Sequence, residues 1–179
     1  MKKELRLSGS GGQGLILAGI ILAEAAIRSN MNAVQTQSYG PEARGGASKA
    51  EVIISENEIN YPKVRKPDIL LCLTQKSFQE YSKDLREDGI LIVDSSVKID
   101  YNTVTGKIYN IPIIETAVNK VGKAMVANIV ALGAIGEVMG IVSQEQLTAA
   151  VLERVPEGTE DLNTLALKEG ALLIKEYAR

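Results

Sequence analysis

The stretch that decides the fold reads Leu5-Arg6-Leu7-Ser8-Gly9-Ser10-Gly11-Gly12-Gln13-Gly14 and continues from position 15 to 29 as LILAGIILAEAAIRS. The segment 5–7 is predicted to be a short strand. The run after Gly14 is apolar almost all round, as is typical of a helix buried against a sheet. A strand, a glycine-rich turn with the pattern G-x-G-x-x-G and a helix, in this order, predict the first unit of a layered α/β fold.

The rest of the chain repeats the alternation of strands and helices. Further strands are predicted at 33–36, 49–55, 68–73 and 89–94, with a weaker one at 108–114. The continuous apolar runs at 68–73 and 89–94 are typical of parallel strands covered on both faces. Thr74, Ser143 and Asp161 are expected to open helices, the last two in a mostly helical segment after Glu115. We therefore predict an α/β fold: one Rossmann-like domain over residues 1–179, with a mainly parallel sheet flanked by helices.

Composition excludes several classes of function. Twenty Lys and Arg stand against 22 Asp and Glu, so no basic excess is available for nucleic acid. The absence of histidine removes Ser-His-Asp and Cys-His nucleophiles and histidine-containing metal sites. The single cysteine, Cys72, can form no internal disulfide and cannot alone ligate an iron–sulfur cluster; between leucines in a predicted strand it is interpreted as a core residue. Asp94, at the end of its predicted strand, is either a site carboxylate or the cap of a turn.

The sequence also predicts where the protein is found. The N-terminus reads MKKELRLSGSGG and lacks the continuous apolar segment of a secretory signal. Between Lys123 and Gln144 the only charge is Glu137, but Asn128 and glycines interrupt the segment, and we interpret it as a buried helix rather than a membrane span. We expect a cytoplasmic protein without a nucleic-acid or membrane partner.

The glycine-rich turn is the first candidate site. Glycines allow sharp turns, and they let backbone N–H groups at a helix N-terminus approach an anion closely. The predicted binding residues here are Gly9, Gly11, Gly12, Gln13 and Gly14. A dinucleotide site needs an acidic residue at the tip of the second strand, where the sequence has Val34-Gln35-Thr36-Gln37, and the Gly-Lys-Ser/Thr of a P-loop is absent. The alternative that the glycines only pack the helix onto the sheet stays open.

A second candidate segment follows the second strand and reads Gln37-Ser38-Tyr39-Gly40-Pro41-Glu42-Ala43-Arg44-Gly45-Gly46. Gly40-Pro41 predicts a turn, and Arg44 carries a planar cation that binds carboxylate or phosphate bidentately. We expect the strand before it to be adjacent to the first strand, which would bring the two loops together at the ligand-binding edge of the sheet. The predicted site residues are Tyr39, Gly40, Arg44, Gly45 and Gly46. A clamp of Arg44 on Glu42 or on backbone, and a surface for another protein chain, are the open alternatives.

Together these residues resemble a known family. Four segments of the chain are similar to the gamma subunit of 2-oxoacid:ferredoxin oxidoreductases, most of all the 2-oxoglutarate type. They are the glycine turn, the segment 37–47, the following Lys49-Ala50-Glu51-Val52 and the later Asn128-x-Val130-Ala131-Leu132-Gly133. The resemblance spans most of the chain. It implies membership of a complex that oxidatively decarboxylates a 2-oxoacid with coenzyme A and passes the electrons to ferredoxin.

The resemblance also implies where the cofactors are held. Thiamine diphosphate and magnesium would belong to alpha and beta subunits, and iron–sulfur clusters to a beta or a ferredoxin-like delta subunit, so this chain alone would hold no cofactor and no metal. The two loops are expected to contribute to coenzyme A binding or to an intersubunit surface, and no catalytic residue is assigned, because the chain has no obvious acid–base pair or nucleophile. Two other classes stay open: a free-standing nucleotide- or dinucleotide-binding domain, and a non-catalytic structural scaffold.

Overall fold

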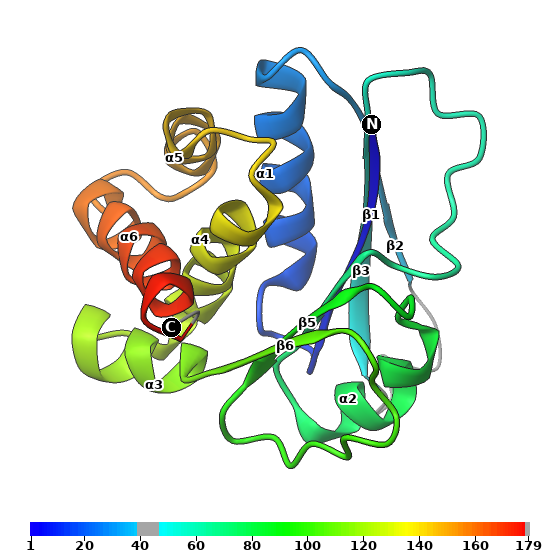
Figure 1. Ribbon diagram of the computed structural model, residues 1–179. Helices are drawn as coiled ribbons and strands as arrows, with labels where there is room; N and C mark the ends of the chain where they lie inside the picture. Colours follow the sequence, from blue (N-terminus) through cyan, green and yellow to red (C-terminus); the bar gives the residue numbers. More distant parts are fainter. Residues whose placement is uncertain (39–46, 178–179) are drawn as a thin grey trace.

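The computed structural model describes residues 1–38 and 47–177. Its centre is a six-stranded sheet with the order β2-β3-β1-β4-β5-β6 (Figure 1). The strands are β1 (Lys2–Gly9), β2 (Asn32–Gln37), β3 (Ser48–Ser55), β4 (Ile69–Cys72), β5 (Ile90–Asp94) and β6 (Lys107–Ile111). The predicted α/β class is confirmed.

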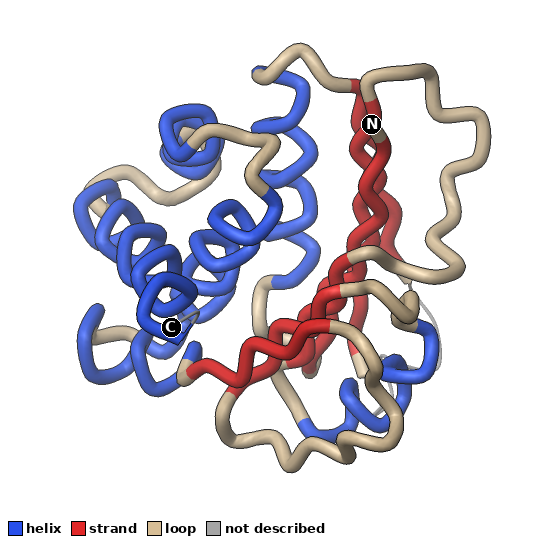
Figure 2. The backbone as a smooth tube through the Cα atoms, viewed as in Figure 1, coloured by secondary structure: helices blue, strands red, loops and turns tan. Residues whose placement is uncertain are grey.

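Helices cover both faces of the sheet unequally. They are α1 (Leu15–Arg28), α2 (Gln75–Tyr81), α3 (Ile113–Thr116), α4 (Ala127–Met139), α5 (Gln144–Leu152) and α6 (Glu160–Tyr177), with short turns η2 (Ser82–Asp84), η3 (Ala117–Val121) and η4 (Ala124–Val126). α1, α4, α5 and α6 gather on one side of the sheet, and α2 lies on the other (Figures 1 and 2). None of the described helices is both long and apolar enough to cross a membrane.

Local signals placed several of these elements correctly. The Thr74 hydroxyl accepts a hydrogen bond from the N–H of Ser77 and opens α2, and the Ser143 hydroxyl accepts one from the N–H of Gln146 and opens α5. α4 is buried on almost every side, as predicted for its apolar segment. The predicted strand at 108–114 is too long: β6 ends at Ile111, and Ile113 already begins α3. Pro112, which has no N–H to continue the strand ladder, stands between them.

The expected neighbour of β1 is also corrected. β4, β5 and β6 run parallel to β1, but β3 lies between β1 and β2 and is antiparallel to both. The sequences of the two strands explain the order. β3 carries the buried run Val52-Ile53-Ile54 and can be covered on both faces, whereas the polar sequence of β2 suits the edge of the sheet. The sheet is thus mostly parallel with one reversed strand.

Candidate functional site

Both candidate loops leave the same edge of the sheet. Gly9, at the end of β1, pairs with Ser48 at the start of β3, and Gln37, at the end of β2, pairs with Ala50. The described residues that flank the second loop therefore lie at the carboxyl end of β1, although β1 and β2 are not adjacent. The second-loop site residues, Tyr39, Gly40, Arg44, Gly45 and Gly46, lie outside the described residues.

The first loop is closed by one of its own side chains. The Oε1 atom of Gln13 accepts a hydrogen bond of 2.7 Å from the N–H of Ser10. Gly9 leaves room for this arrangement, since a Cβ there would collide with Gln13 and lie 3.1 Å from the Leu15 side chain. Gln13 and Gly9 thus have a structural part in shaping the loop.

The middle of the loop faces open space. Gly11 and Gly12 are exposed, and a Cβ on either would meet no atom of residues 1–38 or 47–177 within 4 Å. Gly12 has a φ of 83°, a conformation that favours glycine, whereas Gly11 has no such requirement. Within the residues that the structure describes, Gly11 therefore has nothing to pack against, and the packing alternative does not account for it there.

The loop ends at the N-terminus of α1, where Gly14 is the capping residue. Gly14 makes no side-chain cap, and the first turn of α1 holds no acidic residue, so no side chain of that turn neutralises the positive end of the helix dipole. The Gly14 carbonyl accepts a hydrogen bond of 3.2 Å from Nδ2 of Asn128. A Cβ on Gly14 would lie 2.5 Å from the same nitrogen. This terminus can attract an anion.

The structural role of Asn128 was not predicted from the sequence. It is 5% exposed, sits in the first turn of α4 and joins that helix to the first loop. The sequence did contain one indication of this role, because Asn128 is a single amide among apolar residues at the beginning of the helix.

A groove of about 130 Å³ lies beside this contact. Its walls are mainly apolar and include one cation, Lys123, and the 78% exposed Met125. The lining residues are Leu17, Lys123, Met125, Val126, Asn128, Ile129, Val155, Pro156, Thr159, Leu162 and Asn163. The groove can take an apolar group or chain next to the helix terminus.

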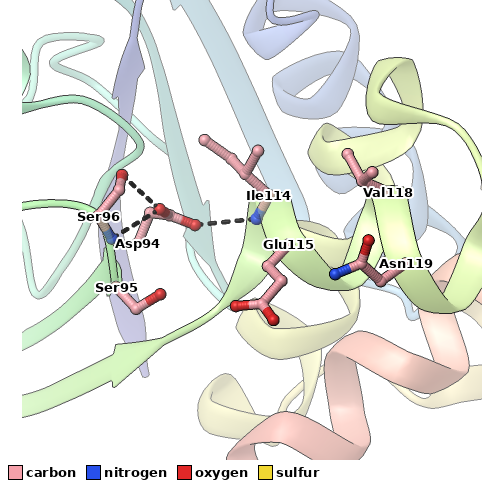
Figure 3. Close-up of a pocket in the computed structure, with 7 residues that line it drawn as sticks. All are labelled: Asp94, Ser95, Ser96, Ile114, Glu115, Val118 and Asn119. Carbon is pink, nitrogen blue, oxygen red and sulfur yellow. Dashed lines mark hydrogen bonds between the residues drawn. The ribbon is translucent and has the colours of Figure 1, made fainter.

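A second pocket, of about 490 Å³, opens at the end of β5 (Figure 3). Asp94 is 2% exposed and its oxygens are used within the chain: Oδ1 accepts from the N–H and hydroxyl of Ser96, and Oδ2 accepts from the N–H of Ile114 at 2.8 Å. Asp94 therefore caps the turn and orders the start of α3. With Glu115 and Asn119 on the opposite wall and no basic residue in its lining, this pocket does not favour an anion.

Cys72 is a core residue, as its sequence context predicted. Its side chain is 0% exposed, and burial raises the pKa of the thiol to about 11. Such a thiol stays protonated at neutral pH and is a poor nucleophile. Within the described residues, no three potential His, Cys, Asp or Glu metal ligands lie together.

Comparison with known proteins identifies the family. Residues 4–173 match the model of the family described as pyruvate ferredoxin/flavodoxin oxidoreductase. The 2-oxoglutarate synthase subunit KorC of Methanocaldococcus jannaschii is 51% identical, and the alignment covers 98% of this chain and 96% of that relative. The crystal structure of a keto/oxoacid ferredoxin oxidoreductase gamma subunit from Geobacter sulfurreducens matches with a TM-score of 0.88 and 50% identity, over 97% of this chain and 99% of that one.

A longer protein contains the same fold. A chain of 2-oxoglutarate:ferredoxin oxidoreductase from Magnetococcus marinus superposes with a TM-score of 0.88 at 20% identity, over 98% of this chain but 31% of that one. Because the family model and the full-length relatives cover nearly the whole sequence, this chain belongs to the pyruvate ferredoxin/flavodoxin oxidoreductase family.

Proposed function

We propose that the chain is the gamma subunit of a 2-oxoacid:ferredoxin oxidoreductase, with 2-oxoglutarate as the substrate of the complex. The complex would decarboxylate the 2-oxoacid, join the acyl group to the sulfur of coenzyme A and pass the released electrons to ferredoxin. The observation that carries this proposal is the 51% identity, over nearly the full length of both chains, with a 2-oxoglutarate synthase subunit. Residues 1–179 would form a single domain.

The residues of this chain support a role in binding rather than in catalysis. The sequence has no histidine, and the only thiol is buried with a raised pKa. Thiamine diphosphate, magnesium and iron–sulfur clusters would be held by alpha, beta or delta subunits, in a cytoplasmic complex. The two loops would bind coenzyme A or a neighbouring subunit, the first through Gly11, Gly12 and the N-terminus of α1, the second through Arg44.

Reconstitution tests the subunit assignment. We expect the purified chain to show no oxidation of 2-oxoglutarate with a dye acceptor, and a complex purified without this chain to regain activity when it is added. Turnover by the isolated chain would contradict the proposal. A dinucleotide that copurifies with the isolated chain would favour a free-standing nucleotide-binding domain, and full activity of the complex without this chain would favour a scaffold.

Single alanine substitutions test the first loop. Gly11→Ala should leave the stability of the isolated chain unchanged, because its Cβ meets no atom among the described residues. If urea unfolding of the isolated chain confirms this, a loss in the complex reports a contact with ligand or partner. Gly12→Ala adds backbone strain of about 1–2 kcal/mol. Gly140→Ala, at the αL end of α4, is the matched control for that strain, because its φ is 66° and its Cβ is also unobstructed. Normal assembly and unchanged coenzyme A kinetics with Gly11→Ala would remove the binding role from this loop.

Two substitutions at Arg44 test the second loop. If its guanidinium binds a carboxylate or phosphate through paired hydrogen bonds, Arg44→Lys should impair the reconstituted complex nearly as much as Arg44→Ala, since an ammonium cannot reproduce the planar fork. Steady-state kinetics with coenzyme A and 2-oxoglutarate varied separately identify the ligand. A rise confined to the KM for coenzyme A indicates its phosphates, and loss of assembly with both variants indicates an intersubunit contact. Wild-type rates and assembly with both would refute the role.

A further inference from the structure

The connection from β3 to β4 is unusual for its length. Residues 56–68 join strands that lie on either side of β1 and contain neither helix nor strand. Because Lys2 of β1 pairs with Ser55, this segment starts at the amino end of β1, at the edge of the sheet opposite to the glycine loop (tan loop on the right in Figure 2). This length is near the upper limit of about 12–15 residues for connections without secondary structure in compact domains, and loops of such length are often functional.

The end of this connection is firmly held. Val64 is 5% exposed, and its carbonyl accepts a hydrogen bond of 3.1 Å from Nη2 of the buried Arg6. The Asp68 N–H donates to the Glu4 carbonyl at 2.7 Å, and the Asp68 carboxylate accepts from the Glu4 N–H at 2.7 Å. The backbone between Val64 and Asp68 is therefore fixed to β1, which lowers the entropy that a partner must offset to bind it.

The fixed backbone presents cations outward. Lys63, Arg65 and Lys66 are exposed on both sides of the buried Val64. Among the described residues, no carboxylate lies within salt-bridge distance of these three side chains. The nearby acidic groups at the amino edge are partly neutralised, since Glu4 pairs with Lys2 at 2.6 Å.

One aromatic residue completes the surface. The Tyr61 ring is 49% exposed and lies under the guanidinium of Arg65, with 5.2 Å between Cζ and the ring centroid. Nη2 of Arg65 also donates to the Tyr61 hydroxyl at 3.2 Å. That hydrogen bond, with the charges of Arg65 and Lys63, holds the pKa of Tyr61 below its ordinary value, which is a sign of positive potential at the hydroxyl. An open pocket of about 260 Å³ lies between Glu4, Tyr61, Lys63 and Arg65.

We propose that Tyr61, Lys63, Arg65 and Lys66 form a docking surface for an acidic segment of another protein. A carboxylate of the partner would accept hydrogen bonds from Arg65, and the flat, pre-ordered Tyr61–Arg65 pair would provide contact area. Tyrosine and arginine are the residue types enriched at the energetic centres of protein interfaces. A protein partner fits better than nucleic acid, because the net charge of the chain is −2 and gives no basic excess to neutralise a run of phosphates. The proposal does not depend on the function of the glycine loops.

Titration of the full-length chain tests the surface. The probe is a fluorescently labelled glutamate-rich peptide, followed by anisotropy at low ionic strength. The triple variant Lys63→Glu/Arg65→Glu/Lys66→Glu should weaken binding by at least about tenfold, and Tyr61→Ala by a smaller factor. The matched control is Lys83→Glu/Lys98→Glu/Lys168→Glu, which changes the net charge equally at exposed lysines elsewhere and should have little effect. Circular dichroism verifies that both variants are folded.

Each other outcome would overturn the proposal. If both triple variants weakened peptide binding equally, the affinity would depend on net charge and not on this surface. If the wild-type chain did not bind the peptide, the proposed docking surface would be refuted. Displacement of the peptide by an equal concentration of inorganic phosphate would indicate a simple anion site. Tighter binding of a single-stranded oligonucleotide than of the peptide would indicate a nucleic-acid surface.

Discussion

The two faces of the sheet are stabilised in different ways. On the face covered by α1, α4, α5 and α6, aliphatic side chains from the strands and helices form one continuous buried cluster. The cluster on the α2 face is much smaller and consists of Ala47, Leu70, Cys72, Phe78, Tyr81, Leu91, Val93, Val97 and Val104. β1 shows the contrast within one strand: Leu5 and Leu7 join the large cluster, whereas Arg6, between them, points the other way.

On the α2 face of the sheet, Arg6 links several elements through ion pairs and hydrogen bonds. Its side chain is 4% exposed, and Nε donates to Glu51 at 2.8 Å while Nη1 binds the Asp84 carboxylate. The guanidinium also lies 5.2 Å from the ring centroid of Tyr81. One side chain thus joins β1 to β3, to η2 and, through Val64, to the 56–68 connection. A face of the sheet with little helical cover can thus be stabilised by one buried cation that binds several acceptors.

The largest expected loss of stability comes from a substitution between α4 and α6, on the face of the sheet that four helices cover. In α4, a Cβ on Gly133 would lie 2.9 Å from the carbonyl carbon of Leu167 in α6 and still closer to its oxygen. Because backbone cannot move aside as a side chain can, Gly133→Ala should lower the free energy of unfolding by about 3 kcal/mol. Urea unfolding measures the loss.

Gly136→Ala is the control for that substitution. Its Cβ would meet the Cδ2 atom of Leu147 at 2.8 Å, which a flexible side chain can relieve. Equal losses for the two alanines would mean that close contact between the α4 and α6 backbones does not determine the packing of this face.

A smaller effect is expected on the other face. Arg6→Met should lower the free energy of unfolding by about 2 kcal/mol. The substitution removes the Arg6 partner of the partly buried Glu51 carboxylate and the hydrogen-bond donor to the Val64 carbonyl. Arg6→Met/Glu51→Leu should recover part of the loss, since the double variant removes a carboxylate whose remaining ion-pair partner in the structure is Lys49 at 4.0 Å. Arg154→Met, which removes an exposed pair with Glu24, should have no measurable effect in the same assay. No loss with Arg6→Met would show that the apolar cluster alone holds the α2 face.

The smallest effect concerns Cys72 and alkaline pH. Burial raises its pKa from 9.0 to about 11, so between these values the unfolded chain loses the proton first and stability falls as pH rises. The contribution is complete below the unfolded pKa, and at about pH 10 the thiol should have lowered the free energy of unfolding by about 1 kcal/mol. Urea unfolding of wild type and Cys72→Ala at neutral pH and at about pH 10 measures this term. Identical alkaline losses in the two proteins would contradict it.

The parts that sequence predicted well depend on neighbours along the chain. The strand, glycine turn and helix at the N-terminus, and the caps at Thr74 and Ser143, are set by residues a few positions apart. The predicted strand at 108–114 runs past the end of β6, because Pro112 ends the strand and α3 begins directly after it. The first candidate loop was located correctly, although its sequence did not reveal that Gln13 closes it.

The sequence by itself determined the α/β class, the glycine turn and the buried character of Cys72, because hydrophobic periodicity and glycine conformation act locally. Only the tertiary structure decided that β3 separates β1 from β2, that Asn128 reaches Gly14 across 114 positions, and that Arg6 finds Glu51 and Asp84 at separations of 45 and 78. An apolar pattern shows that a face is covered but not by which element. A buried polar group needs a partner, and the fold chooses that partner from distant parts of the chain.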